Sequence, residues 1–279
     1  MDEELRNRFL YFHERLKKRD KEISKLTETY TSCGVDLAID IFLPDSETFP
    51  GKRPGVLFFF GGGFVMGCKE AFEPQAVELA KQGYITLCAD YRVTVFHGTS
   101  PQDSIMDGVA AWEYMRKNAD RWGIDVKRTA ISGGSAGGLI SAMIGPLSGV
   151  YPQALVLFNP AINLRGLTSP ILQNLIDKEL NGIPYPTVDS LQPGMPPMLI
   201  LHGLDDDTIP AVKMKEYAEQ AESLGIPVKT VFYPGVNHGF FNFNRSRPHY
   251  LMTLGEMMLF LDQTIGDNVV FGKKNDWIP

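Results

Sequence analysis

A Gly-rich segment in the middle of the chain presents the serine with the strongest signal for chemistry. It reads Gly133-Gly134-Ser135-Ala136-Gly137, the pattern G-x-S-x-G, and joins an apolar run to a helical pattern. A serine on so tight a turn is held in strained backbone geometry, and only small neighbours let the two chain segments pass closely. This context predicts a nucleophilic hydroxyl at a strand end, whereas the five letters alone also fit a glycine-rich turn with an uninvolved serine.

A serine hydroxyl becomes a nucleophile only when a base accepts its proton and a third group orients that base. His238 follows the last predicted strand on a loop that contains glycines. It completes the chain order serine, acid, histidine that is expected after such a turn. His202, which ends a strand beside a glycine, fits a structural role, and His97 lies in a loop where a place in the substrate pocket stays open. The remaining histidines lie on predicted helices: His13 and His249.

Three adjacent carboxylates, Asp205, Asp206 and Asp207, lie in the loop between the serine and His238. One of them is expected to hold the far nitrogen of the imidazole, which keeps the ring in the right tautomer and stabilises its charged form. The others solvate the loop or cap the helix that starts near Pro210. From the residues alone, the choice among the three stays open.

The oxyanion that forms during acyl transfer needs hydrogen-bond donors, and a triple glycine can supply them. Gly61-Gly62-Gly63 follows an apolar run, so its backbone N–H groups are not blocked by side chains. The N–H of Ala136, directly after the serine, is the other expected donor. One such donor typically contributes about 3 kcal/mol in the transition state. A phosphate site is not predicted, because the Lys and Ser/Thr of a P-loop are absent here.

Composition narrows the class of protein. The 279 residues are 44% hydrophobic and 22% charged, with a net charge of −6 and no basic stripe. We therefore expect neither nucleic acid nor an anionic membrane as a partner. No apolar run approaches the roughly 20 residues that cross a bilayer, so no membrane span is expected. The three cysteines are widely spaced, which predicts neither a disulfide framework nor a metal site.

The first residues carry no targeting signal that we recognise. They are acidic and then mixed in charge, without the basic start and apolar middle of a signal peptide. This favours a cytoplasmic location, although a mature secreted form placed behind a new Met would read the same way.

Two regions are expected. Residues 1–28 form a helical extension, because apolar residues at spacings of four, three, four and seven share one helical face. This helix needs a partner surface, which is the main domain, the active site or a second copy in a homodimer. Residues 29–279 form the catalytic domain, with a lid insertion at about 159–197 that contains a helix over 171–180. The apolar positions of the first helix are Leu5, Phe9, Phe12, Leu16 and Ile23.

Strands and helices alternate through the second region, which predicts an α/β fold with a mostly parallel sheet and helices on both faces. The functional groups of such a sheet collect at the carboxyl ends of the strands. Strands are expected at 35–43, 55–60, 84–89, 129–132, 154–158, 198–202 and 228–233, and helices at 71–82, 102–118, 139–144, 211–224 and 248–264. The tail 269–279 has no clear assignment.

Together these motifs resemble an α/β-hydrolase, specifically the esterase group that is similar to hormone-sensitive lipase and to bacterial acetyl and feruloyl esterases. The resemblance spans about residues 34–262 and rests on Gly61–Phe64, Asp90–Arg92, Gly133–Gly138, His202–Pro210 and Tyr233–Phe240. It implies that Asp206 is the acid, with Asp207 second. It also maps the oxyanion donors onto Gly62, Gly63 and Ala136. One residue departs from the family pattern: Phe60 stands where His precedes the glycines, which puts the support of this loop in question.

The expected protein is a serine carboxylesterase with the triad Ser135, Asp206 and His238 and no metal or organic cofactor. Its expected substrates are small-molecule or carbohydrate-linked esters with short acyl groups of the acetyl type, cleaved through an acyl-enzyme. Apolar pocket walls are expected from Phe64 and Phe240, with Phe96 and Phe241 as further candidates. Two alternatives stay open. A prolyl-oligopeptidase-like peptidase would cleave a peptide amide, and a non-enzymatic receptor on the same fold would bind a ligand without turnover.

Overall fold

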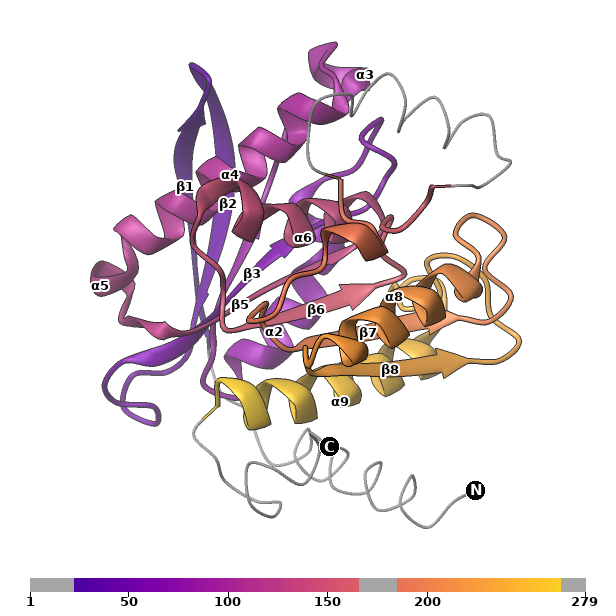
Figure 1. Ribbon diagram of the computed structural model, residues 1–279. Coiled ribbons are helices and arrows are strands. Elements are labelled where there is room, and N and C mark those ends of the chain that lie inside the picture. The colour runs from indigo at the N-terminus through magenta and orange to yellow at the C-terminus, as the bar shows by residue number, and fades with distance from the viewer. Residues whose placement is uncertain (1–22, 166–184, 267–279) are drawn as a thin grey trace.

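A single eight-stranded sheet forms the centre of the computed structural model, which describes residues 23–165 and 185–266 (Figure 1). The strand order is β1-β2-β4-β3-β5-β6-β7-β8. The last six strands in this order run parallel, and β1 and β2 are antiparallel at one edge. The strands are β1 (Ser24–Ser32), β2 (Val35–Leu43), β3 (Arg53–Phe59), β4 (Ile85–Ala89), β5 (Ile124–Gly134), β6 (Ala154–Phe158), β7 (Met198–Gly203) and β8 (Val228–Tyr233).

Continuous apolar runs form the inner strands, because helices cover both faces of a parallel sheet. The side chains of Val56–Phe59 in β3 are at most 1% exposed, and all of β6 and β7 is buried. On one face lie α4 (Pro101–Lys117), α6 (Ala136–Ser148) and α8 (Ala211–Ser223). On the other lie α2 (Glu73–Ala80) and α9 (Arg247–Thr264) (Figure 1). Four short helices complete the described part: η1 (Lys69–Phe72), α3 (Thr94–His97), α5 (Ala119–Trp122) and η3 (Val188–Ser190).

The predicted α/β class and mostly parallel sheet are confirmed, and the strands at 35–43, 154–158 and 228–233 match to the residue. The helical extension over 1–28 is wrong at its end. Residues from Ser24 onward belong to strand β1, which pairs with β2 along its whole length. The rest of that extension, its homodimer contact, the helix over 171–180 and the tail lie outside the described residues. In the described flanks of the lid insertion, 159–165 and 185–197, the only helix or strand is η3.

The segment after β4 fastens the sheet to α4. The Arg92 guanidinium forms a buried ion pair with Asp107 of α4, with Nη2 and Oδ1 2.7 Å apart. Asp107 also accepts the backbone N–H of Arg92 at 2.9 Å. Asp90-Tyr91-Arg92 therefore has a structural role at the end of β4. Within 23–165 and 185–266, no helix has the length and apolar character needed to span a membrane.

Candidate active site

The turn between β5 and α6 holds Ser135 in an unusual backbone conformation. Ser135 has φ 53° and ψ −117° and stands at the N-cap of α6. The positions two residues before and after it must be glycines, because a Cβ at Gly137 would collide with the carbonyl oxygens of Phe59 and Phe60. A side chain at Gly133 would collide with the Gly137 carbonyl in the same way. The close approach of three segments thus produces the strained turn and lifts the hydroxyl above the sheet.

Ser135, His238 and Asp206 form a continuous chain of hydrogen bonds. His238 Nε2 lies 2.9 Å from Ser135 Oγ, and His238 Nδ1 lies 2.8 Å from Asp206 Oδ2. Because a carboxylate only accepts hydrogen bonds, Nδ1 carries the ring proton and Nε2 remains as the acceptor for the serine hydroxyl. Such a chain can remove a proton from the hydroxyl and stabilise the imidazolium that forms.

Asp206 is the carboxylate that reaches the imidazole. It is buried, and its Oδ1 accepts the backbone N–H groups of Thr208 at 3.0 Å and Ile209 at 2.8 Å. These bonds orient the carboxylate and leave Oδ2 for His238. Asp205 and Asp207 are exposed. The Asp207 carboxylate accepts from its neighbour Thr208 at 3.3 Å rather than from His238.

His202 lies beside Asp206 as a buried, neutral ring. Burial lowers the pKa of His202, so the imidazole is uncharged near pH 7. Its Nε2–H donates to the Ile209 carbonyl at 2.8 Å, while Asp206 Oδ2 is 3.4 Å away. His202 therefore braces the loop that carries Asp206 without competing with His238 as a second cation. This agrees with the structural role that its sequence position indicated.

The Gly61–Gly63 loop passes directly over the serine turn. A Cβ on Gly61 would lie 3.0 Å from the Gly134 carbonyl oxygen, so a side chain here would be tightly crowded against the serine turn. Gly62 has φ +133° and its carbonyl accepts the N–H groups of Val65 and Met66, at 3.1 and 3.3 Å. Among the hydrogen bonds of the described residues, none uses the N–H groups of Gly62, Gly63 or Ala136. These three N–H groups therefore have no acceptor among the described residues.

Two stacked rings support the base of this loop. The Phe60 and Tyr91 rings lie 3.9 Å apart at their centroids with planes 9° apart, and the Tyr91 hydroxyl donates to the Phe60 carbonyl at 2.7 Å. Gly67, with φ +129°, also passes close to the Phe60 ring, with which a Cβ would collide. The position at which the sequence departs from the family pattern is thus filled by an aromatic anchor.

Two residues that the sequence did not single out contact the His238 loop. Asn159, fully buried at the end of β6, accepts the Gly239 N–H through Oδ1 at 3.0 Å. Its Nδ2 lies 3.4 Å from His238 Nε2. The Arg245 Nη1–H donates to the His238 carbonyl at 2.7 Å. A polar residue at a strand end was the only signal for Asn159, and nothing in the local sequence marked Arg245.

A pocket of about 380 Å³ opens over Ser135 and His238. Its apolar wall comes from Phe72 and Phe241, whose rings stack 5.7 Å apart. The expected wall residues Phe64 and Phe240 do not line it, which corrects that expectation. Both are packed into the core, Phe64 at 1% and Phe240 at 5% exposure. Phe96 and His97 are on α3 and do not line the pocket either.

Within the described part of the chain, no cluster of His, Cys, Asp or Glu side chains forms a metal site. The site instead brings together a serine hydroxyl, an imidazole, a carboxylate and backbone N–H groups without an acceptor among the described residues. Such groups are suited to acyl transfer.

Comparison with known proteins finds similarity to esterases. A family model described as BD-FAE matches residues 39–153. The chain is 27% identical over 258 residues to esterase LipC of Mycobacterium tuberculosis, covering 82% of this chain and 63% of LipC. It is 29% identical over 211 residues to an acetylxylan esterase of Xylanibacter ruminicola, covering 71% of this chain and 42% of that protein. The chain thus spans only part of the length of these curated relatives.

A solved structure covers nearly the whole fold. The propionate-bound esterase Est2 of Thermogutta terrifontis is 30% identical, with a TM-score of 0.78 over 88% of this chain and 96% of that chain.

Proposed function

Because the chain belongs to the serine esterases of the α/β-hydrolase fold, we propose that it hydrolyses carboxylic esters with Ser135 as the nucleophile. The observation that carries the proposal is the unbroken hydrogen-bond chain from Ser135 Oγ through His238 to Asp206. In the first step His238 Nε2 takes the hydroxyl proton while Oγ attacks the ester carbonyl carbon. Asp206 stabilises the imidazolium, and the carbonyl oxygen becomes an oxyanion.

The oxyanion is held by the backbone N–H groups of Gly62, Gly63 and Ala136 in this mechanism. When the tetrahedral intermediate collapses, His238 gives its proton to the leaving alcohol and an acyl-Ser135 ester remains. Water then enters, His238 takes its proton, and the hydroxide attacks the acyl carbon. Collapse of the second intermediate releases the acid and returns the proton to Ser135 Oγ, so no metal or organic cofactor takes part.

Short acyl groups are the proposed substrates, including acetyl groups on carbohydrates. The size of the pocket supports a short chain, because the Phe72 and Phe241 rings wall a cavity of about 380 Å³. The similarity to a propionate-bound esterase and to an acetylxylan esterase supports the same class.

A series of p-nitrophenyl esters from acetate to decanoate, assayed beside acetylated xylan and a peptide p-nitroanilide, tests this proposal. We expect kcat/KM to be highest at two to four acyl carbons, with release of acetate from xylan and no cleavage of the amide. Preferential cleavage of the peptide amide would replace the esterase by a peptidase. Binding of the esters without turnover would favour a receptor.

A further inference from the structure

A second cavity lies on the sheet away from Ser135. It measures about 400 Å³ and lies between the C-terminal half of α6, the first residues of β6 and β7, the segment 185–196 and α8. It shares no lining residue with the pocket over Ser135. The catalytic groups lie at the carboxyl ends of the strands, whereas Leu155 and Met198 of this cavity lie at the starts of β6 and β7.

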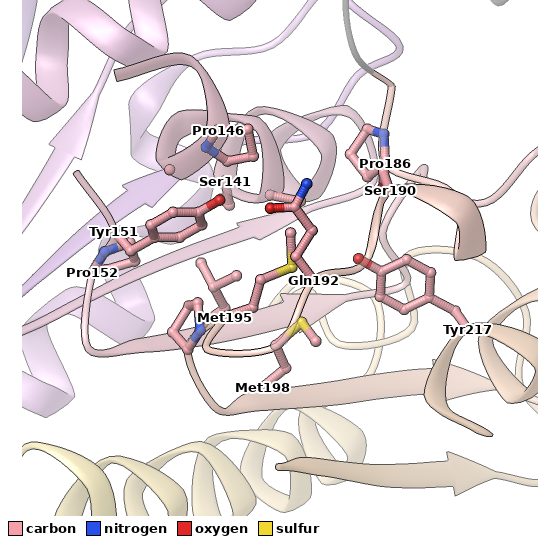
Figure 2. Close-up of a pocket in the computed structure, with 14 residues that line it drawn as sticks. Ser141, Pro146, Tyr151, Pro152, Pro186, Ser190, Gln192, Met195, Met198 and Tyr217 are labelled. Atoms are coloured by element: carbon pink, nitrogen blue, oxygen red, sulfur yellow. The ribbon is translucent and has the colours of Figure 1, made fainter. Parts of the chain in front are cut away.

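A buried tyrosine side chain faces this cavity with its hydroxyl. Tyr217 of α8 is only 3% exposed, and burial raises the pKa of its hydroxyl well above the usual range. No hydrogen bond to this hydroxyl is formed by the described residues. Figure 2 shows that the hydroxyls of Tyr217 and Tyr151 point into the cavity from opposite sides, with Met195 and Met198 on its floor. This hydroxyl is reachable from the cavity and uses none of the described residues as a partner, so it is available to donate to a ligand.

Some of the other polar side chains at the cavity wall already form hydrogen bonds within the protein, and others are available to a ligand. The Ser141 hydroxyl donates to the Gly137 carbonyl at 2.7 Å, and Ser190 donates to the Thr187 carbonyl at 2.8 Å. Tyr151 and Gln192 are exposed at the mouth. The unused donors are therefore two phenols and an amide, which suit an oxygen acceptor.

The charge of the lining restricts the ligand. None of the described residues that line this cavity is acidic, basic or a histidine. An ion entering it would lose its hydration without meeting an opposite charge, which is costly. Four prolines and two methionines make up much of the wall, and thioether sulfur packs favourably against aromatic rings. The wall residues of these two types are Pro146, Pro152, Pro186, Pro196, Met195 and Met198.

We propose that this cavity is a non-catalytic binding site for an uncharged aromatic molecule that carries a carbonyl oxygen. The ring lies against the proline and methionine side chains, and the carbonyl oxygen accepts the Tyr217 hydroxyl. A volume of about 400 Å³ falls within the range of small-molecule sites, about 300–1,000 Å³. This site is independent of the proposed ester hydrolysis.

Titration of the full chain with acetophenone tests the site by NMR of ¹³C-methyl-labelled methionine. Met195→Leu and Met198→Leu identify the two cavity signals. The Met66 methyl signal reports on the glycine loop 61–63, because the Met66 N–H donates a hydrogen bond to the Gly62 carbonyl. We expect saturable shifts of the Met195 and Met198 methyl signals, with benzoate binding at least about tenfold more weakly than acetophenone.

Tyr217→Phe should raise the acetophenone Kd about fivefold, which corresponds to one hydrogen bond of about 1 kcal/mol. Tyr250→Phe, a change at a buried tyrosine of α9 outside this cavity, is the matched control and should leave Kd unchanged. Thermal melts of both variants establish that they fold. The proposal is overturned if acetophenone gives no saturable shift of the two signals, if benzoate binds as tightly, or if Tyr217→Phe leaves Kd unaltered.

Discussion

Phe60 and Tyr91 are joined by two different contacts, a ring stack at 3.9 Å and a 2.7 Å hydrogen bond from the Tyr91 hydroxyl to the Phe60 carbonyl. Phe60 directly follows β3, and Tyr91 follows β4. The pair therefore fixes the point where the chain leaves the sheet to form the glycine loop over Ser135. An apolar stack here provides the support that the family resemblance assigns to a histidine.

Separate changes to the two contacts should have different effects. Tyr91→Phe removes the hydrogen bond but keeps the stack, so we expect a loss of about 1 kcal/mol in unfolding free energy and a severalfold drop in kcat. Phe60→Ala removes the stack, which should cost about 3–5 kcal/mol and most of the activity. Urea unfolding and p-nitrophenyl acetate hydrolysis measure the two effects. Full activity of a folded Phe60→Ala variant would show that the loop does not depend on this ring.

Gly62 and Gly63 are adjacent but should differ in their tolerance of a side chain. A Cβ on Gly62, at φ +133°, would collide with the Met66 carbonyl oxygen, whereas a Cβ on Gly63, at φ +63°, meets open space. Gly62→Ala should displace the loop and lower kcat by about 100-fold or more, as loss of an oxyanion donor does. Gly63→Ala carries only the cost of a left-handed residue, about 1–2 kcal/mol, and should stay within tenfold of the parent. Equal kcat values for the two variants would contradict this placement of the donors.

The sequence predicted strands well where burial on both faces requires apolar residues. The strand at 154–158 is apolar throughout because both of its faces are covered, and its predicted bounds match the structure. Strand β1 was missed because it is an edge strand with mostly exposed side chains, so tertiary pairing with β2 rather than an apolar pattern holds it. The β-branched residues Thr27, Thr29 and Thr31 were the available signal for it.

The candidate site was foreseeable to the extent that it lies in short motifs. Ser135 and His238 lie in glycine-rich turns whose geometry demands small neighbours. In the structure, Ser135 Oγ and His238 Nε2 are 2.9 Å apart. Asn159 and Arg245 act through contacts with the His238 loop that depend on three-dimensional packing. The same dependence explains why Phe241, rather than Phe64, walls the pocket: both are aromatic, and only packing decides which one faces the cavity.

Asn159 should influence the protonation of His238. Its Nδ2 lies 3.4 Å from His238 Nε2, so Asn159→Asp places a carboxylate beside the imidazole. A nearby negative charge stabilises the imidazolium form of His238. Because the base must be neutral to accept the serine proton, the acid limb of the kcat/KM profile should move to higher pH.

Asn159→Ala is the matched control for this charge. It removes the bond to the Gly239 N–H and should lower kcat about tenfold without moving the acid limb. The interpretation fails if the two variants have the same pH profile, since the effect would then be structural only.

His202 should make the fold less stable in mild acid. Burial lowers its pKa below the value of about 6.5 in an unfolded chain, so below that pH the unfolded state binds a proton that the folded state does not. The unfolding free energy therefore falls as the pH drops below about 6.5, by at most about 1.4 kcal/mol per pH unit from this group. Urea melts of the parent and His202→Gln at pH 7.5, 6.5 and 5.5 measure the difference, which should shrink as the pH falls.

The exposed ring of His97 on α3 provides the control, because His97→Gln should leave the pH dependence of stability as it is in the parent. A constant difference between the parent and His202→Gln at all three pH values would exclude His202 as the source.

The nucleophilic role of Ser135 is the centre of the account, and covalent labelling tests it most directly. The parent, treated with diisopropyl fluorophosphate and examined by intact-mass and peptide mass spectrometry, should gain one diisopropylphosphoryl group on the peptide that contains Ser135. Its hydrolysis of p-nitrophenyl acetate should disappear in proportion, while Ser135→Ala should take up no label. A stoichiometric label on another residue, or an unlabelled parent that still hydrolyses the ester, would contradict the assignment.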